Sequence, residues 1–83
     1  MSILKHPLST EKSIRMMESD NILTFMVSGE AKKAEIKKEI ENLFKAKVIR
    51  VNTNKMPDGR KKAYVKLSPE VPAIDIATKL GMV

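Results

Sequence analysis

Cationic and amide side chains alternate with apolar ones along two runs near the middle of this 83-residue chain, Val48–Asn54 and Arg60–Leu67. In a β-strand, every second side chain points to the same face. One face of the two runs therefore gathers Arg50, Asn52, Asn54, Arg60, Lys62, Tyr64 and Lys66. Ammonium, guanidinium and amide groups bind phosphate and ribose oxygens, and a tyrosine ring can stack on a base. The pattern predicts an RNA-binding surface.

A short segment, Met56-Pro57-Asp58-Gly59, separates the two runs and predicts a tight turn. Proline presets φ, aspartate bonds to the nearby backbone, and glycine tolerates a positive φ. We therefore expect a β-hairpin over Val48–Leu67. Its other face is expected to join the core, and that face carries Ile49, Val51, Thr53, Lys61, Ala63, Val65 and Leu67.

The net charge of +6 is concentrated in the middle of the chain. Residues 31–66 hold 12 of the 16 Lys and Arg residues and only four of the ten acids, so this segment carries +8 and the remainder −2. A basic patch confined to one folded segment indicates a polyanionic partner. The alternative is a lysine-rich surface whose charges only keep the protein solvated.

Five further elements are expected to position the hairpin. Ser9 and Thr10 suit a helix N-cap, and an acid in the first turn, Glu11, is favoured by the helix dipole. Two prolines after the hairpin prevent a strand or helix from continuing through Ser68–Pro72. The expected elements are a strand at Ile3–Lys5, a helix from Ser9 or Thr10 to Asp20-Asn21, a strand at Asn21–Val27, a helix at Glu30–Lys45 and a helix at Ala73–Leu80 that ends at Gly81.

The resulting order, β-α-β-α-β-β-α, predicts an α+β sandwich that forms a single domain over residues 1–83. We expect a mainly antiparallel sheet covered by the long helix. Apolar side chains at i, i+4, i+7 and i+8 give this helix its buried stripe. The predicted core pairs Ile36, Ile40, Leu43 and Phe44 of the helix with Leu23, Phe25, Val27, Ile49, Val51, Ala63 and Val65 of the sheet.

Catalysis has little support in the sequence. The chain has one histidine, His6, no cysteine, and acids that stand singly, so it offers neither a nucleophile with its base nor a metal-ligand cluster. No apolar run approaches the roughly 18 residues of a membrane span. We therefore expect a soluble intracellular protein that is not an enzyme and has no cofactor, metal, small-molecule substrate or membrane contact.

Four blocks of the chain resemble a known protein family. Pro7–Ser13 matches a Thr/Ser-Glu-Lys motif, and Asn21–Val27 matches an N-x-x-x-F-x-V strand. Ala31–Lys37 matches an A-x-K-x-E-I-K helix start, and the fourth block is Asn42–Thr53 followed by Gly59–Leu67. Together these blocks, in register over nearly the whole chain, resemble the large-subunit ribosomal protein family numbered twenty-three.

The resemblance implies a cytoplasmic protein, a monomer within the ribosome, that lies on large-subunit rRNA beside the exit of the peptide tunnel, among neighbouring ribosomal proteins. It also implies a docking site for the signal recognition particle, with the docking carboxylate on Glu11. The rRNA contacts implied by the family overlap the basic hairpin face and fall on Ser9, Thr10, Lys12, Lys32, Lys33, Lys37, Arg50, Asn52, Lys62 and Tyr64.

The short hairpin turn departs from the bacterial members of the family. Those members carry a long basic extension between the last two strands, and it reaches into the tunnel. Here only Met56–Gly59 joins the strands, so the chain resembles the archaeal type and we expect no tunnel-sensing role.

Two other functions remain open from the sequence. Ala63–Leu67 resembles half of the aromatic strand motif of RNA-recognition-motif proteins, although Lys61 and Lys62 stand where that motif has glycine and an aromatic residue. A protein-interaction adaptor would need an exposed apolar patch, for which Met16 and Met17 are the candidates.

Overall fold

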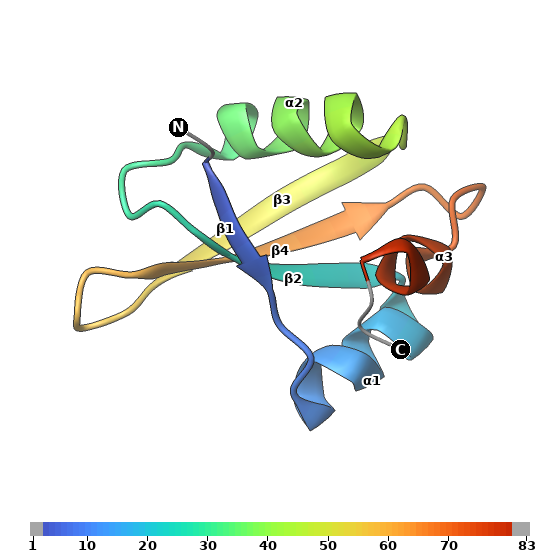
Figure 1. The fold of residues 1–83 in the computed structure, drawn as a ribbon, viewed down its shortest axis with the longest axis horizontal. Coiled ribbons are helices and arrows are strands. Elements are labelled where there is room, and N and C mark those ends of the chain that lie inside the picture. Colours follow the sequence, from blue (N-terminus) through green and yellow to red (C-terminus); the bar gives the residue numbers. More distant parts are fainter. Residues whose placement is uncertain (1–2, 81–83) are drawn as a thin grey trace.

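The computed structural model describes residues 3–80 and contains the predicted succession of elements (Figure 1). The expected end of the last helix at Gly81 lies outside the described residues. The first strand begins one residue later than predicted and continues to the proline. The elements are β1 (Leu4–Pro7), α1 (Glu11–Asp20), β2 (Ile22–Val27), α2 (Lys33–Phe44), β3 (Val48–Lys55), β4 (Lys61–Leu67) and α3 (Ala73–Lys79).

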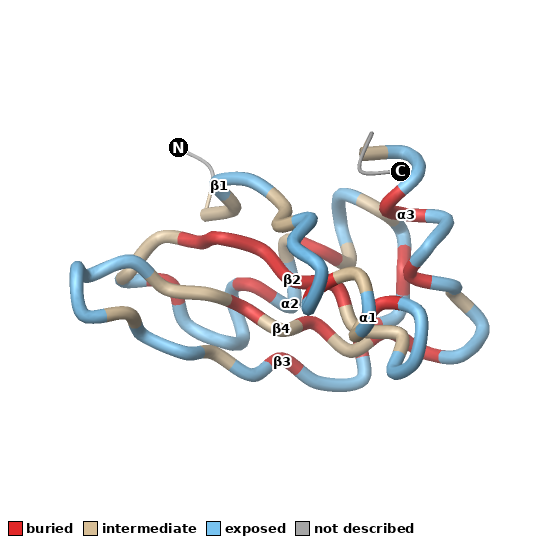
Figure 2. Tube along the Cα trace, turned by 90° about the horizontal axis from the view of Figure 1, so that it is seen from below, coloured by how far each residue is buried: buried red, intermediate tan, exposed pale blue. Residues whose placement is uncertain are grey.

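The four strands form one antiparallel sheet in the order β1-β2-β4-β3. α2 lies along one face of the sheet, and α1 lies on the opposite face (Figures 1 and 2). β2 and β4 are the central strands, and five of the six residues of β2 are buried. The α+β prediction, with its antiparallel sheet and covering helix, is confirmed.

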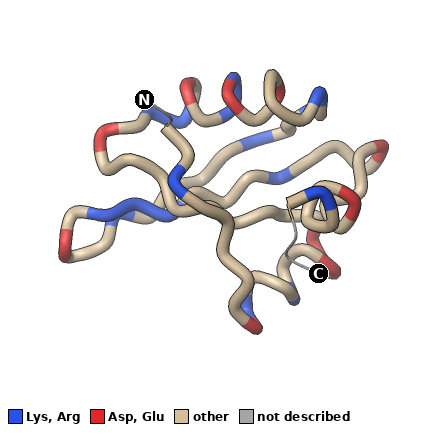
Figure 3. The backbone as a smooth tube through the Cα atoms, viewed as in Figure 1, with Lys and Arg blue, Asp and Glu red and all other residues tan. Residues whose placement is uncertain are grey.

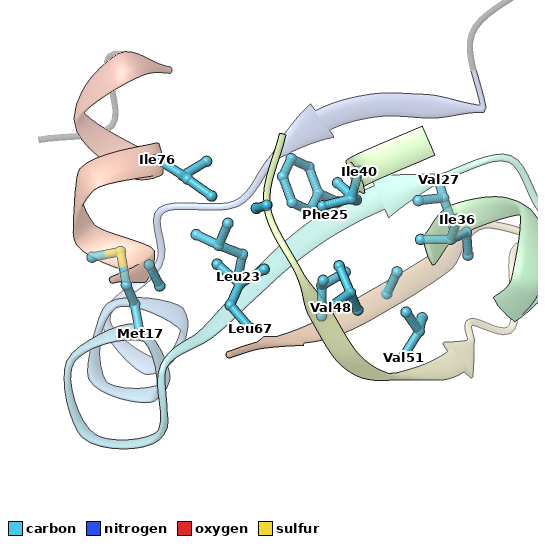
Figure 4. Packing of buried hydrophobic residues seen from close by; sticks show 14 of the residues in the cluster. Met17, Leu23, Phe25, Val27, Ile36, Ile40, Val48, Val51, Leu67 and Ile76 are labelled. Carbon is cyan, nitrogen blue, oxygen red and sulfur yellow. The ribbon is translucent and has the colours of Figure 1, made fainter. Parts of the chain in front are cut away.

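The main core lies between the sheet and α2 (Figure 4). Ile36 and Ile40 of α2 are fully buried, and they face side chains that alternate along the strands. α3 extends this core by adding Ile76 beside Leu23 and Leu67 at the far end of the sheet. Because the cluster of buried residues in this core contains one aromatic ring, that of Phe25, close packing of aliphatic side chains must supply most of the stability.

Two predicted core residues, Leu43 and Ile49, are exposed, at 55% and 49%. Ile49 is the extra residue of a β-bulge: Val48 pairs with Leu67 and Arg50 pairs with Lys66, so two steps along β3 match one step along β4. Val48 takes the predicted place of Ile49 in the core. Leu43 lies in the last turn of α2, where the next residue, Phe44, is the one that packs against the core.

Local hydrogen bonds hold the start of α1 against the sheet. The hydroxyl of Thr10 accepts the backbone N–H of Ser13 at 3.2 Å, which confirms the predicted N-cap. The hydroxyl of Ser13 lies 3.0 Å from the carbonyl of Leu8 and 2.9 Å from that of Thr10. Leu8 in turn donates its N–H to the Thr24 carbonyl at 2.9 Å. The first turn of α1 is therefore fixed to the middle of β2.

Asn21 connects the end of α1 with three other segments. It adopts the left-handed conformation, with φ 58°, and caps α1. Its side-chain amide donates to the carbonyls of Leu67, Ser68 and Val71 at 3.0–3.2 Å. Its amide oxygen accepts the N–H of Ala73 at 2.6 Å. One side chain thus joins α1, the end of β4, the proline linker and the start of α3.

The hairpin turn has the predicted residues and packs against a second loop. Met56 donates its N–H to the Arg60 carbonyl at 2.7 Å, and Gly59 has a φ of 94°, which favours glycine. A Cβ placed on Gly29, in the loop after β2, would overlap the carbonyl oxygen of Gly59. Glycine at position 29 therefore permits the close approach of the two loops.

Candidate nucleic-acid interface

The register of β2, β4 and β3 aligns the predicted polar residues in three rows, because directly opposed residues share a face. Tyr64 pairs with Asn52 and Thr24. Lys66 pairs with Arg50, and Lys62 pairs with Asn54. We call this surface the basic face, and it consists of Arg50, Asn52, Asn54, Lys62, Tyr64 and Lys66.

The strand β3 residues of the basic face are exposed, and its β4 residues are half-buried. Within residues 3–80 the ion pairs are Arg15 with Glu11 and Arg60 with Asp58. The three cations of the basic face therefore have no carboxylate partner in the described chain. Figure 3 shows Lys and Arg positions along the hairpin, with an acidic position at its tip. Such a surface favours a polyanion.

Arg60 does not continue the strand alternation as predicted, because β4 begins at Lys61 and Arg60 lies in the turn. Its backbone N–H donates to Asp58 Oδ1 at 3.1 Å, and its guanidinium Nε donates to Asp58 Oδ2 at 2.7 Å. The backbone hydrogen bond, followed by the guanidinium, lowers the pKa of Asp58 from its ordinary value. The only acid of the hairpin is thus paired within the turn.

Lys61 shows that not every hairpin cation points to the basic face. It lies on the α2 side of the sheet, where its Nζ donates to the carbonyl of Ala31 at 2.9 Å. The alternation predicted for β4 is therefore confirmed, with Lys61, Ala63, Val65 and Leu67 on one face and Lys62, Tyr64 and Lys66 on the other.

The start of α1 lies beside the basic face, so two predicted groups of RNA-binding residues share one surface. A small pocket of about 30 Å³ lies between them. Thr10 and Lys12 line it from α1, and Lys62 and Tyr64 line it from β4. Ser9 is exposed just before the helix. The complete lining is Leu8, Thr10, Lys12, Ser13, Met16, Thr24, Lys62 and Tyr64.

Thr24 was not among the predicted site residues. It is 3% exposed, lines the pocket, and has the one buried side-chain oxygen in residues 3–80 without a hydrogen-bond partner. A single hydroxyl within the apolar run Ile22–Val27 was the available signal in the sequence. The hydroxyl's neighbours, however, depend on how α1 packs, which the strand pattern does not reveal.

The lysines of α2 belong to a different surface. Lys32, Lys33 and Lys37 are exposed, as predicted from the helix pattern. α2 covers the sheet face opposite α1, so these three lysines lie across the sheet from the basic face. The structure does not bring the two groups of cations together.

Glu11 lies in the first turn of α1, and its side chain is 82% exposed. Its carboxylate accepts a hydrogen bond from Arg15 at 2.8 Å, one helical turn later. Exposed pairs of this kind contribute little to stability, about 0.3–0.5 kcal/mol. The carboxylate is therefore accessible to a binding partner.

Among residues 3–80, no three His, Asp or Glu side chains gather where they could hold a metal ion. No helix in that part of the chain combines the length and apolar character needed to cross a bilayer.

Comparison with known proteins decides the family. Residues 2–75 match the model of the protein family described as Ribosomal protein L23. The chain belongs to this family. It is also 47% identical over 81 residues to the large ribosomal subunit protein uL23 of Trypanosoma brucei brucei. That alignment covers 98% of this chain and 49% of the relative, so the chain spans about half the length of the curated protein it matches.

These matches support the resemblance found in the motif blocks. They do not support the archaeal type suggested by the short hairpin turn. The relative described above is a trypanosome protein, and the description of the family does not mention archaea.

Proposed function

We propose that this chain is a structural component of the large ribosomal subunit in the cytoplasm, where it binds large-subunit rRNA and has no catalytic role. Membership of the L23 family and similarity to a large-subunit protein support the ribosomal role. The observation that carries rRNA binding is the basic face, where Arg50, Lys62 and Lys66 have no carboxylate partner within the described chain.

The basic face suits recognition of the shape and phosphates of RNA more than recognition of base sequence. Its cations and amides can contact phosphate and ribose oxygens. Tyr64 provides one ring for stacking, whereas sequence-specific sheet surfaces present two or three aromatic rings. Thr10 and Lys12 extend the surface at the start of α1. The lysines at the start of α2 would contact a second rRNA segment on the other side of the sheet.

The salt dependence of binding tests this proposal. If about five phosphates are neutralised, log K for a large-subunit rRNA fragment falls against log salt with a slope of about −4. Lys62→Gln should weaken binding and make the slope shallower by about 0.7–0.9, the value of one phosphate contact. Lys79→Gln, an exposed lysine on α3, is the matched control. Binding that is indifferent to salt, or equal effects of the two variants, would refute the proposal.

We further propose that the chain lies near the peptide-tunnel exit and contributes to docking of the signal recognition particle through Glu11. The exposure of the Glu11 carboxylate and the Thr/Ser-Glu-Lys motif support this role. Glu11→Lys should weaken binding of the particle to ribosomes while leaving rRNA binding intact, and Glu18→Lys, also exposed on α1, is the control. If Lys62→Glu and Arg50→Glu spare rRNA association while Glu11→Lys abolishes a protein contact, a protein-interaction adaptor becomes the better description.

A further inference from the structure

A second cleft lies at the end of the sheet that carries the hairpin turn. It has a volume of about 430 Å³, within the range of about 300–1,000 Å³ that small-molecule sites occupy. β1, the end of β2, the loop that follows it and the hairpin turn all contribute to its walls. The lining residues are Lys5, His6, Met26, Val27, Ser28, Gly29, Gly59 and Arg60.

The lining combines apolar surface with two flat polar groups. Met26 and Val27 are buried, and methionine adapts readily to the shape of an aromatic ligand. His6 supplies an imidazole and Arg60 a guanidinium, both planar groups on which nucleobases stack. There is no carboxylate among the lining residues. This chemistry suits a flat heterocycle better than an isolated phosphate, which binds through charge and needs no apolar surface.

Two features hold the cleft in shape. Asp58 accepts both the backbone N–H and the Nε–H of Arg60, so the guanidinium is oriented although most of the Arg60 side chain is exposed. The loops at Gly29 and Gly59 approach so closely that no Cβ fits at position 29. The wall that joins these loops is therefore backbone, and its position does not depend on the conformation of a flexible side chain.

The cleft is continuous with the basic face. His6 pairs with Met26 on β2, Met26 pairs with Lys62 on β4, and Lys62 pairs with Asn54 on β3. This row runs across the sheet from the cleft to the exposed edge of the basic face. A strand of RNA whose phosphates meet Lys62 and Asn54 therefore passes beside the cleft.

We propose that the cleft holds one nucleobase turned out of the bound RNA, stacked on the Arg60 guanidinium and flanked by the His6 imidazole. This inference rests on the proposed rRNA binding and adds a base-binding site to a surface otherwise suited to phosphates. It also gives Arg60 a role that differs from the phosphate contact predicted from the sequence. The planar shape of the guanidinium, as well as its charge, contributes to binding.

The first measurement is ultraviolet cross-linking of the purified full chain to large-subunit rRNA fragments, followed by mass spectrometry of the peptide–nucleotide adducts. Adducts are expected on the peptides that contain His6 or Arg60, and they identify the nucleotide concerned. Adducts confined to peptides of the basic face would overturn the inference.

The second measurement compares Arg60→Lys with the native chain on the same fragment, before and after the cross-linked nucleotide is made abasic. Lysine keeps the charge but lacks the plane, so affinity should fall about fivefold to tenfold, as for the loss of one stacking contact, with the salt slope unchanged. The abasic fragment should weaken the native chain by a similar factor and cause no further loss in the variant. Arg15→Lys, another exposed arginine paired with a nearby carboxylate, is the matched control.

The outcomes separate the two proposals. If Arg60→Lys binds as tightly as Arg15→Lys, or if the losses from the variant and the abasic site multiply, the cleft does not hold a base although salt-dependent rRNA binding stands. If no salt-dependent rRNA binding is found, the proposed function and the inference that rests on it both fail. Arg60 is 62% exposed, so its replacement should leave the fold intact, and circular dichroism checks this.

Discussion

Replacing Asn21 by alanine should lower the free energy of unfolding by about 4–5 kcal/mol. The side chain makes four hydrogen bonds to three segments distant in sequence. Three carbonyls share the two amide hydrogens of Asn21, so these contacts count as about two full bonds, and the bond accepted by the amide oxygen is the third. Each bond contributes about 1 kcal/mol. Alanine also adopts the left-handed conformation at a cost of about 1–2 kcal/mol. A small domain has only about 0.05–0.15 kcal/mol of stability per residue, so this loss removes much of the total.

Urea unfolding followed by circular dichroism measures the effect. Asn21→Gly separates the two contributions, because glycine accepts the positive φ but makes none of the side-chain bonds, so it should be more stable than Asn21→Ala by about 1 kcal/mol. Asn42→Ala, an exposed asparagine on α2, is the control and should change stability by no more than about 0.5 kcal/mol. If Asn21→Ala unfolds at the same urea concentration as Asn42→Ala, the linking role assigned to Asn21 is wrong.

Two further predictions concern the hairpin and the core. Ile40→Ala should lower the free energy of unfolding by about 2–5 kcal/mol because it leaves a cavity. Ile49→Ala should lower it by less than about 1 kcal/mol because the side chain is exposed at the bulge. Equal losses of the two variants in urea unfolding would contradict the bulge in β3. The pKa of the Asp58 carboxyl is lowered in the folded state, so its charged form stabilises the turn. This contribution should be fully present above the pKa that Asp58 has in the unfolded chain, and it should be lost as pH falls through the pKa that Asp58 has in the folded protein. A carboxylate titration by NMR measures that pKa, and a value at or above the ordinary one would contradict the hydrogen bond from Arg60.

The sequence predicted the element order well because each element has its own local signal. The helix stripe, the alternation in β4, the turn residues and the proline linker all act over a few positions. The bulge in β3 has no such signal. Since Val48 and Ile49 are both apolar and β-branched, either could begin the buried series, and only the pairing with β4 shows that Val48 does. Alternation alone assigned Ile49 to the wrong face.

The basic face was predictable for the same reason, whereas its surroundings were not. Side chains alternate between the two faces of a strand, and the turn length sets the register of a hairpin. These two rules place Asn52, Lys62 and Tyr64 on the same face. Thr10 and Tyr64 line the same pocket, whereas Lys32 lies away from the basic face. Both results depend on which side of the sheet each helix packs. The position of Arg60 depends on a side-chain bond in the turn, to Asp58. Packing of this kind is set by the whole fold.

The strand order also determines which parts of the protein can form early in folding. β3 and β4 are joined by a short turn, so their hairpin closes locally, whereas β4 must find β2 across a loop that contains α2 and β3. Pairing of this non-local kind slows folding, toward about milliseconds rather than microseconds in mixed α and β domains. The hairpin alone carries the cations of the basic face, Arg50, Lys62 and Lys66. The charged ribbon can therefore form before the central strands have paired.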